Sequence, residues 1–343
     1  MYGGIVIYTG NFGVNKVSQV VVVDEEAGWR LDRWFKRHYP ELRHPHLEKL
    51  LRTGQIRLDG RRAKAGERLS EGQTIRIPPI SRAPVIDGYA NKAPDNSVTE
   101  FDKKMLRQAI LYQDDEIIAL NKPAGLAVQG GTGTTRHLDG MLDALQFDAK
   151  ERPRLVHRLD RDTSGVLLLA RTASAARYLT KAFQMKTTRK IYWAVVVGEP
   201  RPNQGKIDAP LIKLPGARGD EKVTVSESMG KNAVTVYATA DVAHKKATWL
   251  MLWPITGRTH QLRVHCALMG TPILGDGKYG GGAAYPPGFE TVKLHLHAHE
   301  LTIPQPSGKS LRIEAPLPPH MAETWRFFEF NARVNSEIFS DFT

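Results

Sequence analysis

Two aspartates lie in a basic stretch near the middle of the chain, where a carboxylate could do chemistry. The segment LVHRLDRDTSGVLLLAR, residues 155–171, places Asp160 between Arg158 and Arg161, and Asp162 follows two residues later. Neighbouring cations stabilise the charged form of a carboxylate, so Asp160 is poorly suited to donate a proton at neutral pH. These residues alone leave three roles open: a nucleophile, an electrostatic stabiliser or a structural ion pair, which is the commonest outcome.

The residues after the two aspartates predict how Asp160 is held in place. The sequence TSG is expected to form a tight turn. It leads into GVLLLA, residues 165–170, which has the composition of a buried strand. The turn would hold Asp160 at the end of that strand. We expect Asp162 to support the turn together with Thr163 and Ser164.

The charge of the chain predicts a polyanionic partner. Among 343 residues there are 48 Lys and Arg against 36 Asp and Glu, a net charge of +12. The excess is concentrated at residues 152–193, where ten Lys and Arg accompany two Asp. A basic surface of this kind is typical of proteins that bind nucleic acid, although many basic proteins bind none.

Cysteine usage and hydropathy limit the class of protein. Cys266 is the only cysteine, which excludes an intrachain disulfide and a cysteine-based zinc site and fits a reducing cytoplasm. No apolar run approaches the ~18 residues of a membrane span, so we expect no membrane partner. Residues 1–16 lack the features of a secretory signal or a transit peptide and are expected to be a disordered start.

Residues 17–79 are expected to form a small basic domain. WRLDRWFKRHY (29–39) and HLEKLLRTG (46–54) predict two short helices, and the residues up to 79 predict short strands broken by glycines. The unit resembles the S4 RNA-binding domain in RLDRWF and in LEKLLRTGQIRLDGRRAKAGERLSEGQTIRI, although Pro45 stands where that family usually has a small polar residue. The resemblance implies an RNA-binding surface, to which we assign Arg33, Arg52 and Arg57.

The rest of the chain predicts a linker and a larger second domain. Residues 80–109 are expected to be the linker, because the start of this segment is rich in Pro, Ala, Asn and Asp without periodicity. Residues 110–330 contain many predicted strands and few helices, which favours an α+β fold with a mixed, largely antiparallel sheet. One helix is expected at 259–270, with Thr259 as its N-terminal cap and Gly270 as its stop.

Two further patterns could bind a ligand but are better explained in other ways. QGGTGTT (129–135) lacks the common phosphate-loop spacings, so we expect a flexible loop. His295, His297 and His299 would share one strand face and could hold a metal, but no carboxylate or cysteine at matched spacing accompanies them. Structural hydrogen bonds are their favoured role, and no metal site is predicted.

The segment around Asp160, HRLDRDTSGVLLLA, is similar to the signature of the RluA-type pseudouridine synthases. Other segments resemble that family's motifs in the same order: NKPAGLAVQGG (121–131), TTRKIYWAVVVG (187–198) and PITGRTHQLRVHCALMGTPILGDGKYG (254–280). Together with LHLHAHELTI they span nearly all of residues 110–319. With the S4-like unit in front, the chain resembles the ribosomal members RluC and RluD.

The resemblance implies three catalytic residues. Asp160 matches the catalytic nucleophile, and Arg263 matches an arginine that is expected to pair with Asp160 and keep it ionised. Tyr192 is expected to pack against uracil, with its oxygen available to help remove the C5 proton. Lys122 and Asp276 are expected to have structural roles only.

The resemblance also implies how RNA is engaged. Arg158 is expected to enter the RNA stack where the target base leaves, because a planar guanidinium stacks on bases. Arg161 and Arg258 are assigned to RNA binding. The target base must leave the stack before any side chain can reach it.

The implied activity is the isomerisation of specific uridines to pseudouridine in large-subunit (23S) ribosomal RNA. The bond from C1′ to N1 breaks, the base turns and rejoins through C5, and the C5 proton leaves, so no cofactor is required. The same chemistry on tRNA and a non-catalytic RNA-binding ribosome assembly factor are the alternatives. We expect a monomeric, cytoplasmic protein.

Overall fold

The chain folds into two units, residues 1–91 and 92–343, in a computed structural model. The structure describes residues 17–39, 42, 44–79, 98–131, 134, 136–185, 187–215, 221–305, 308–331 and 338–339. The expected disordered start, residues 1–16, and residues 80–97 of the expected linker lie outside the described residues.

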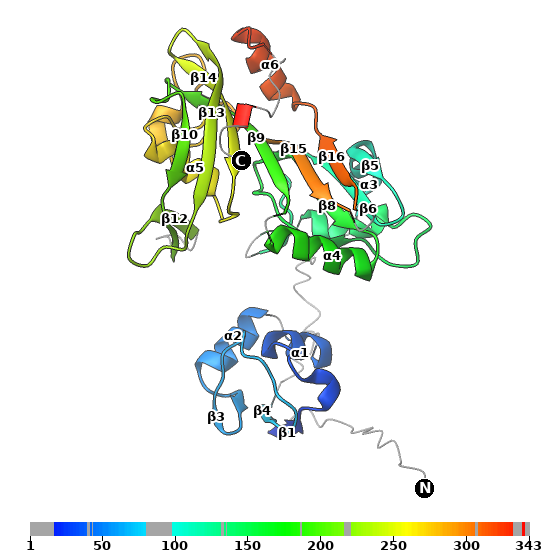
Figure 1. Ribbon diagram of the computed structural model, residues 1–343. Helices are drawn as coiled ribbons and strands as arrows, with labels where there is room; N and C mark the ends of the chain where they lie inside the picture. The colour runs from blue at the N-terminus through cyan, green and yellow to red at the C-terminus, as the bar shows by residue number, and fades with distance from the viewer. Residues whose placement is uncertain are drawn as a thin grey trace, which may run out of the picture. The chain divides into compact units, whose positions relative to one another are not determined.

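The first unit combines two helices with a small antiparallel sheet (Figure 1). The helices α1 (Leu31–His38) and α2 (His44–Arg52) confirm the two that the sequence predicts. A 3-10 turn, η1, spans Asp24–Glu26. The sheet has the strand order β1 (Ser18–Val21), β4 (Thr74–Ile77), β2 (Arg57–Leu58) and β3 (Arg61–Arg62). Trp34 and Phe35 of α1 are buried in the core of this unit, as their helical spacing predicts.

The second unit is built on one large sheet, which is antiparallel at every pairing between its described strands except that of β15 with β8. Its main path runs through β10 (Gln204–Asp208), β13 (Val234–Ala243), β14 (Ala247–Pro254), β9 (Arg189–Val197), β15 (Leu296–Pro304), β8 (Ser164–Ala170), β6 (Ile117–Lys122) and β5 (Ile110–Gln113). β16 (Ser310–Glu314) pairs with β15, and β7 (Arg154–Leu155) pairs with β8. β11 (Leu211–Pro215) and β12 (Glu221–Val225) form a separate hairpin. The predicted mixed, largely antiparallel α+β architecture of this unit is confirmed.

Helices lie around this sheet (Figure 1). They are α3 (Glu100–Gln108), α4 (Ala173–Gln184), α5 (Gln261–Leu268) and α6 (Pro319–Phe327), with 3-10 segments η2 (Leu138–Leu145) and η3 (Gly281–Ala284). α4 packs against β8, and α5 packs against β13 and β14. Among the described residues, no helix is both long enough and apolar enough to cross a membrane.

The helix α3 corrects the predicted linker. It lies inside residues 80–109, and a capping box formed by Thr99 and Asp102 starts it. Leu106 is buried in the core of the second unit, and the Asp102 carboxylate pairs with the Arg136 guanidinium at 2.5 Å. The second unit therefore begins before residue 100 rather than at residue 110.

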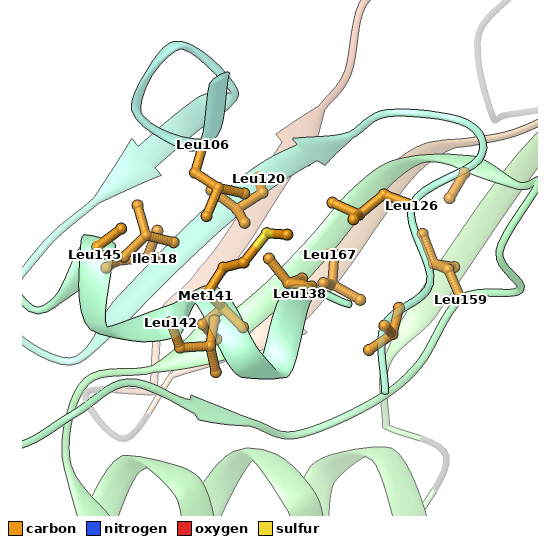
Figure 2. Close-up of a cluster of buried hydrophobic side chains, with 14 residues drawn as sticks. Leu106, Ile118, Leu120, Leu126, Leu138, Met141, Leu142, Leu145, Leu159 and Leu167 are labelled. Atoms are coloured by element: carbon orange, nitrogen blue, oxygen red, sulfur yellow. The ribbon is translucent and has the colours of Figure 1, made fainter. Parts of the chain in front are cut away.

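One of the hydrophobic clusters of the second unit reaches the loop that carries Asp160. Figure 2 shows Leu106 of α3, Ile118 and Leu120 of β6, and Leu167 of β8 packing around η2. Leu159 belongs to the same cluster and is almost fully buried. Burial of this side chain fixes the loop against the core, because removing apolar surface from water stabilises the folded state.

Gly165 allows β8 to approach β15 closely just after that loop. Its φ is +110°, a conformation that favours glycine, and a Cβ at this position would overlap the backbone of Ala298 on β15. This is where the parallel pairing occurs, with Ser164 opposite His297 and Gly165 opposite Ala298. The predicted turn therefore needs glycine for close strand packing as well as for its backbone conformation.

Candidate active site

A cavity of about 660 Å³ opens beside Asp160. Tyr192, Arg263, Arg158 and Arg258 line the same cavity, so five of the predicted site residues are brought together. Arg161 instead lines a second cavity of about 680 Å³, which shares Asp160, His260 and Arg263 with the first. Arg33, Arg52 and Arg57 are exposed on the first unit.

Core packing before Asp160 and a turn after it fix this residue beside the cavities. Leu159 packs in the hydrophobic core (Figure 2) and also borders the cavity that its neighbours Arg158 and Asp160 line. The turn closes through the Thr163 N–H, which donates to the Asp160 backbone carbonyl at 3.2 Å. The Asp160 side chain remains about a quarter exposed, at 24 %.

Lys122 stabilises the loop that carries Asp160 from its buried side. Its buried Nζ donates to the backbone carbonyls of Pro123, Leu126 and Arg161 at 2.8, 2.9 and 3.0 Å. Burial lowers the pKa of Lys122 to about 7, while the charges of Asp162 and Asp160 act in the opposite direction. The three carbonyls use all three protons of an ammonium group, which agrees with the structural role expected for this lysine.

His157 connects the loop that carries Asp160 to strand β8. Its Nε2 accepts a hydrogen bond from the Leu168 N–H at 2.8 Å, so the neutral ring carries its proton on Nδ1. The ring stacks on Phe183, with centroids 4.4 Å apart. Burial, and then the charge of Lys190, lower the pKa of His157 to about 3, so it stays neutral. His157 is thus a structural hydrogen-bond acceptor in the loop that carries Asp160.

Arg263 pairs with Asp276 rather than with Asp160, which makes the predicted pairing wrong. Its Nε and Nη2 donate to the two Asp276 carboxylate oxygens at 2.8 and 2.6 Å. Burial lowers the pKa of Arg263, but the hydrogen bonds and charge of Asp276, with a smaller contribution from Asp160, outweigh it, and the pKa is raised. Arg263 lies on α5, and the loop that carries Asp276 packs against the Arg263 guanidinium. Asp276 therefore accepts both hydrogen bonds.

His260 is the ionisable partner that the structure places beside Asp160, and it was not identified from the sequence. Its Nε2 lies 3.9 Å from Asp160 Oδ2, and its Nδ1 lies 2.6 Å from the Tyr279 hydroxyl. The prediction that Thr259 caps α5 is wrong, because the cap position is His260, and no side-chain capping hydrogen bond forms there. Gly270 lies just beyond the last turn of this helix with a φ of +76°, as predicted.

Tyr192 comes from β9 and faces the cavity. Burial, and then the negative charge of Asp160, raise the pKa of Tyr192 well above its usual value. The phenol therefore stays protonated at neutral pH. A protonated phenol can pack against a base and donate a hydrogen bond but is a poor acceptor for the C5 proton, so packing is the role that this environment favours.

Asp162 does not support the turn as predicted. Its carboxylate pairs with the neighbouring Arg161 at 3.1 Å, and its side chain is 41 % exposed. The Ser164 hydroxyl instead bonds to His297 Nδ1 at 2.8 Å across the parallel strands. Arg158 is exposed and reaches the Gln129 amide oxygen at 3.4 Å, while Arg258 Nε donates to the Asn232 carbonyl at 3.0 Å.

His297 and His299 of β15, and His295 just before this strand, make structural hydrogen bonds, as favoured from the sequence. His295 Nε2 bonds to the Thr324 hydroxyl at 2.8 Å, and His297 and His299 bond to the Ala315 carbonyl at 3.1 and 3.0 Å. Over the described part of the chain, no group of three or more His, Cys, Asp or Glu side chains is arranged to hold a metal ion.

Comparison with known proteins decides the family. A family model described as RNA pseudouridylate synthase matches residues 116–268. The chain is 35 % identical over 300 residues to "Ribosomal large subunit pseudouridine synthase C" of Rickettsia typhi, covering 87 % of this chain and 97 % of the relative. The chain belongs to the RNA pseudouridine synthase family. A protein of the same title from Vibrio cholerae is also 35 % identical, over 309 residues, with 89 % and 95 % of the two chains covered.

Other relatives extend this RNA pseudouridine synthase family beyond bacteria. "RNA pseudouridine synthase 4, mitochondrial" of Arabidopsis thaliana is 35 % identical over 372 residues and covers 84 % of this chain and 77 % of the relative. The structure titled "Human RNA Pseudouridylate Synthase Domain Containing 4" matches with a TM-score of 0.55 at 27 % identity, covering 67 % of this chain and 96 % of that one. The chain is thus an RNA pseudouridine synthase similar to those titled large-subunit synthase C.

Three residues of this synthase were missed or undervalued by sequence reasoning. They are His260, Gln261 and Tyr279, which all lie in the segment 254–280 that resembles a family motif. A motif does not tell which side chains contact one another. Gln261 Oε1 accepts from the Thr256 hydroxyl and the Arg258 N–H, and its Nε2 donates to the Val234 carbonyl and the Thr235 hydroxyl. A buried amide with satisfied donors and acceptors fixes the turn that presents His260.

Proposed function

We propose that this synthase converts specific uridines to pseudouridine in large-subunit (23S) ribosomal RNA, with Asp160 as nucleophile on a flipped-out base. The observation that carries the mechanism is the cavity that Asp160 shares with Tyr192, Arg158 and Arg258. The ribosomal target is supported by the titles of the bacterial relatives. The match with this chain covers 97 % and 95 % of the length of those relatives.

The charges around Asp160 suit a nucleophile. Arg263 and Arg258 line its cavity and Arg161 lines the neighbouring one, so cationic side chains gather around the carboxylate. The same cations attract the RNA backbone. One cluster of arginines thereby surrounds the acid and attracts the substrate.

The reaction needs only a rearrangement of bonds. Asp160 adds to the sugar or to the uracil ring as the bond from C1′ to N1 breaks. The detached uracil turns within the cavity, C5 bonds to C1′, the carboxylate is released, and the proton lost from C5 is balanced by a proton gained at N1. No electrons are gained or lost overall, so the isomerisation needs no redox cofactor.

Two side chains handle the flipped base in this proposal. Arg158 is exposed at the cavity and fills the gap left in the RNA stack, because a guanidinium stacks on bases. The protonated Tyr192 packs against the uracil ring inside the cavity.

We further propose that residues 17–79 form an S4-like domain that adds RNA affinity. Arg33, Arg52 and Arg57 are exposed there. Arg33 lies over the Trp29 ring, with the guanidinium carbon 5.3 Å from the ring centroid, and Arg57 is oriented by hydrogen bonds to the carbonyls of Gly54 and Gly60. Oriented guanidinium groups are suited to phosphate binding.

We also propose that the enzyme is cytoplasmic and monomeric. A single, fully buried cysteine, Cys266, suits a reducing compartment. Cell fractionation together with light scattering of the purified chain tests both statements.

A pseudouridine map tests the target. Ribosomal and transfer RNA from cells with and without the gene should differ at uridines of 23S RNA, and the wild-type gene should restore those positions. Loss of sites confined to tRNA would replace the ribosomal target with tRNA. An unchanged map in both RNA classes would contradict both targets.

A further inference from the structure

His260 adopts a backbone conformation that side-chain-bearing residues rarely take. It starts α5 with φ 53° and ψ 18°, in the left-handed region. For a residue other than glycine this conformation is strained and persists only where the surroundings impose it. The surroundings here are the turn held by the buried Gln261 amide, described above.

The side chain of His260 is turned toward the catalytic residues rather than toward its own helix. No capping hydrogen bond to α5 forms. The ring instead lies between Asp160 and Tyr279, is 18 % exposed, and lines both cavities that meet at Asp160. Backbone strain at a residue that faces the acid is the kind of strain found at functional sites.

Tyr279 favours one tautomer of the His260 ring. The Val223 N–H donates to the Tyr279 hydroxyl oxygen at 3.3 Å, which leaves the hydroxyl proton to donate to His260 Nδ1, 2.6 Å away. A neutral imidazole that accepts at Nδ1 carries its proton on Nε2. Nε2 is the nitrogen that faces Asp160 Oδ2 at 3.9 Å.

Burial keeps the His260 ring neutral. Burial lowers the pKa of His260 most, and Arg263 and Lys278 lower it further, while Asp160 and Asp276 raise it; the net shift is downward. Tyr279 is itself held by Arg263, whose guanidinium lies 5.1 Å from the phenol ring centroid. His260 therefore offers a single N–H to the carboxylate without adding a positive charge.

We propose that His260 is a positioning residue for Asp160, donating from Nε2 to one carboxylate oxygen once RNA closes the site, with Tyr279 fixing the tautomer. This rests on the proposed role of Asp160. Hydrogen bonds at active sites are often long without substrate and shorten when it binds. The bond would hold one oxygen and leave the other facing the substrate.

The first test uses His260→Asn in the full-length chain. Asparagine tolerates the left-handed conformation, so the turn is retained while the N–H at the Nε2 position is lost. The single-turnover rate on a ribosomal RNA fragment should fall roughly tenfold to a hundredfold, as for other groups that orient a reactive residue, with RNA affinity nearly unchanged. His244→Asn is the matched control, because His244 is exposed and also has a positive φ, 48°, on the turn between β13 and β14; its rate should equal that of the wild type.

The second test reads the tautomer without activity. Nitrogen chemical shifts of histidine-labelled full-length protein should show His260 neutral with its proton on Nε2. Tyr279→Phe keeps the ring beside Arg263 but removes the hydroxyl, so it should shift His260 toward a mixture of tautomers and lower the single-turnover rate. This measurement decides the matter even where His260→Asn folds poorly.

The outcomes separate this inference from the proposed mechanism. A proton on Nδ1 in the wild type, or a wild-type rate in folded His260→Asn, overturns the positioning role. If those results occur while Asp160→Asn is inactive, only the His260 inference fails. If Asp160→Asn retains activity, the proposed mechanism itself fails.

Discussion

Arg263 and Asp276 form a buried, two-bonded ion pair that ties α5 to the loop preceding η3. The guanidinium donates at 2.8 and 2.6 Å, and the two side chains are 9 % and 0 % exposed. The same guanidinium also lies against the Tyr279 ring. The pair therefore fixes the position of Arg263 in the cavity, while Asp160 lines the same cavity without pairing with Arg263.

Asp276→Asn should destabilise the fold strongly. The change is nearly isosteric but leaves the buried Arg263 charge without its counter-ion, which typically costs about 3–5 kcal/mol. Urea unfolding of the variant and the wild type measures this loss. Glu100→Gln removes the exposed ion pair with Lys103 and serves as the control, which should change the unfolding free energy little. Equal effects of the two variants would show that the buried pair does not stabilise the protein.

Asp160→Asn should abolish pseudouridine formation. The amide keeps the shape of the side chain but lacks the charge and most of the nucleophilicity of the carboxylate. Turnover should fall to background in a single-turnover assay, with folding unchanged by circular dichroism. Asp162→Asn is the neighbouring control: its carboxylate forms an ion pair with exposed Arg161 and does not line the cavity that Asp160 shares with Tyr192, so we expect wild-type chemistry. A near wild-type rate in Asp160→Asn would mean that another group performs the reaction.

The sequence predicted the strand that leads away from Asp160 and the group of residues around it, because both depend on local patterns. VLLLA is continuous and apolar, and Gly165 marks the close approach to β15. The resemblance of several motifs in one order then brought Asp160, Tyr192, Arg158 and Arg263 to a common site. The structure places these side chains around one cavity.

The partner of Arg263 could not be read from the sequence, since it depends on how α5 packs against a loop 13 residues away. Asp160, Asp162 and Asp276 are equally plausible partners until that packing is known. The helix α3 is a different case, because Thr99 and Asp102 carry the spacing of a capping box. Its few apolar residues obscured that signal. The left-handed His260 has no such local signature, because long-range hydrogen bonds of Gln261 impose it.

Arg158→Ala should slow turnover on structured RNA by roughly tenfold to a hundredfold, the range expected when one side chain no longer stacks on a base. The exposed Arg158 side chain is held by a weak hydrogen bond to Gln129 at 3.4 Å, so the fold should not change. The rate should recover in part on a short single-stranded RNA, where little stacking opposes base flipping. Arg201→Ala, exposed and paired with Glu199, is the matched control. Equal reductions on both RNAs would point to a role in chemistry instead.

A chain that begins at residue 98 should fold and retain the Asp160 chemistry, because the second unit has its own hydrophobic clusters and includes the capped helix α3. Removing the first unit takes away Arg33, Arg52 and Arg57. The slope of log affinity against log salt should therefore become shallower by roughly 2 to 3, one increment for each phosphate that is no longer neutralised. Filter binding across a salt series measures the slope. An unchanged slope would mean that the first unit does not bind the RNA backbone.

Stability should fall in mild acid because His295 is buried in its neutral form. Burial lowers the pKa of His295 to about 4, from 6.5, and its ring joins the Lys293 carbonyl to the Thr324 hydroxyl of α6. Between these two values the unfolded chain binds more protons than the folded chain, so the stabilisation is complete above pH 6.5 and is lost as the pH falls toward 4.

The loss of stability assigned to His295 is about 2 kcal/mol by pH 5, from the two pKa values. Urea unfolding at pH 7 and pH 5 measures it. His295→Gln should be less stable at pH 7, because one ring hydrogen bond is removed or strained, but should lose less further stability on acidification, by about that amount. The exposed His244→Asn should keep the wild-type difference between the two pH values. If His295→Gln also kept the wild-type difference in stability between pH 7 and pH 5, the acid sensitivity would belong to other buried groups. His297 would be the first of these to test, since burial lowers its pKa to about 3.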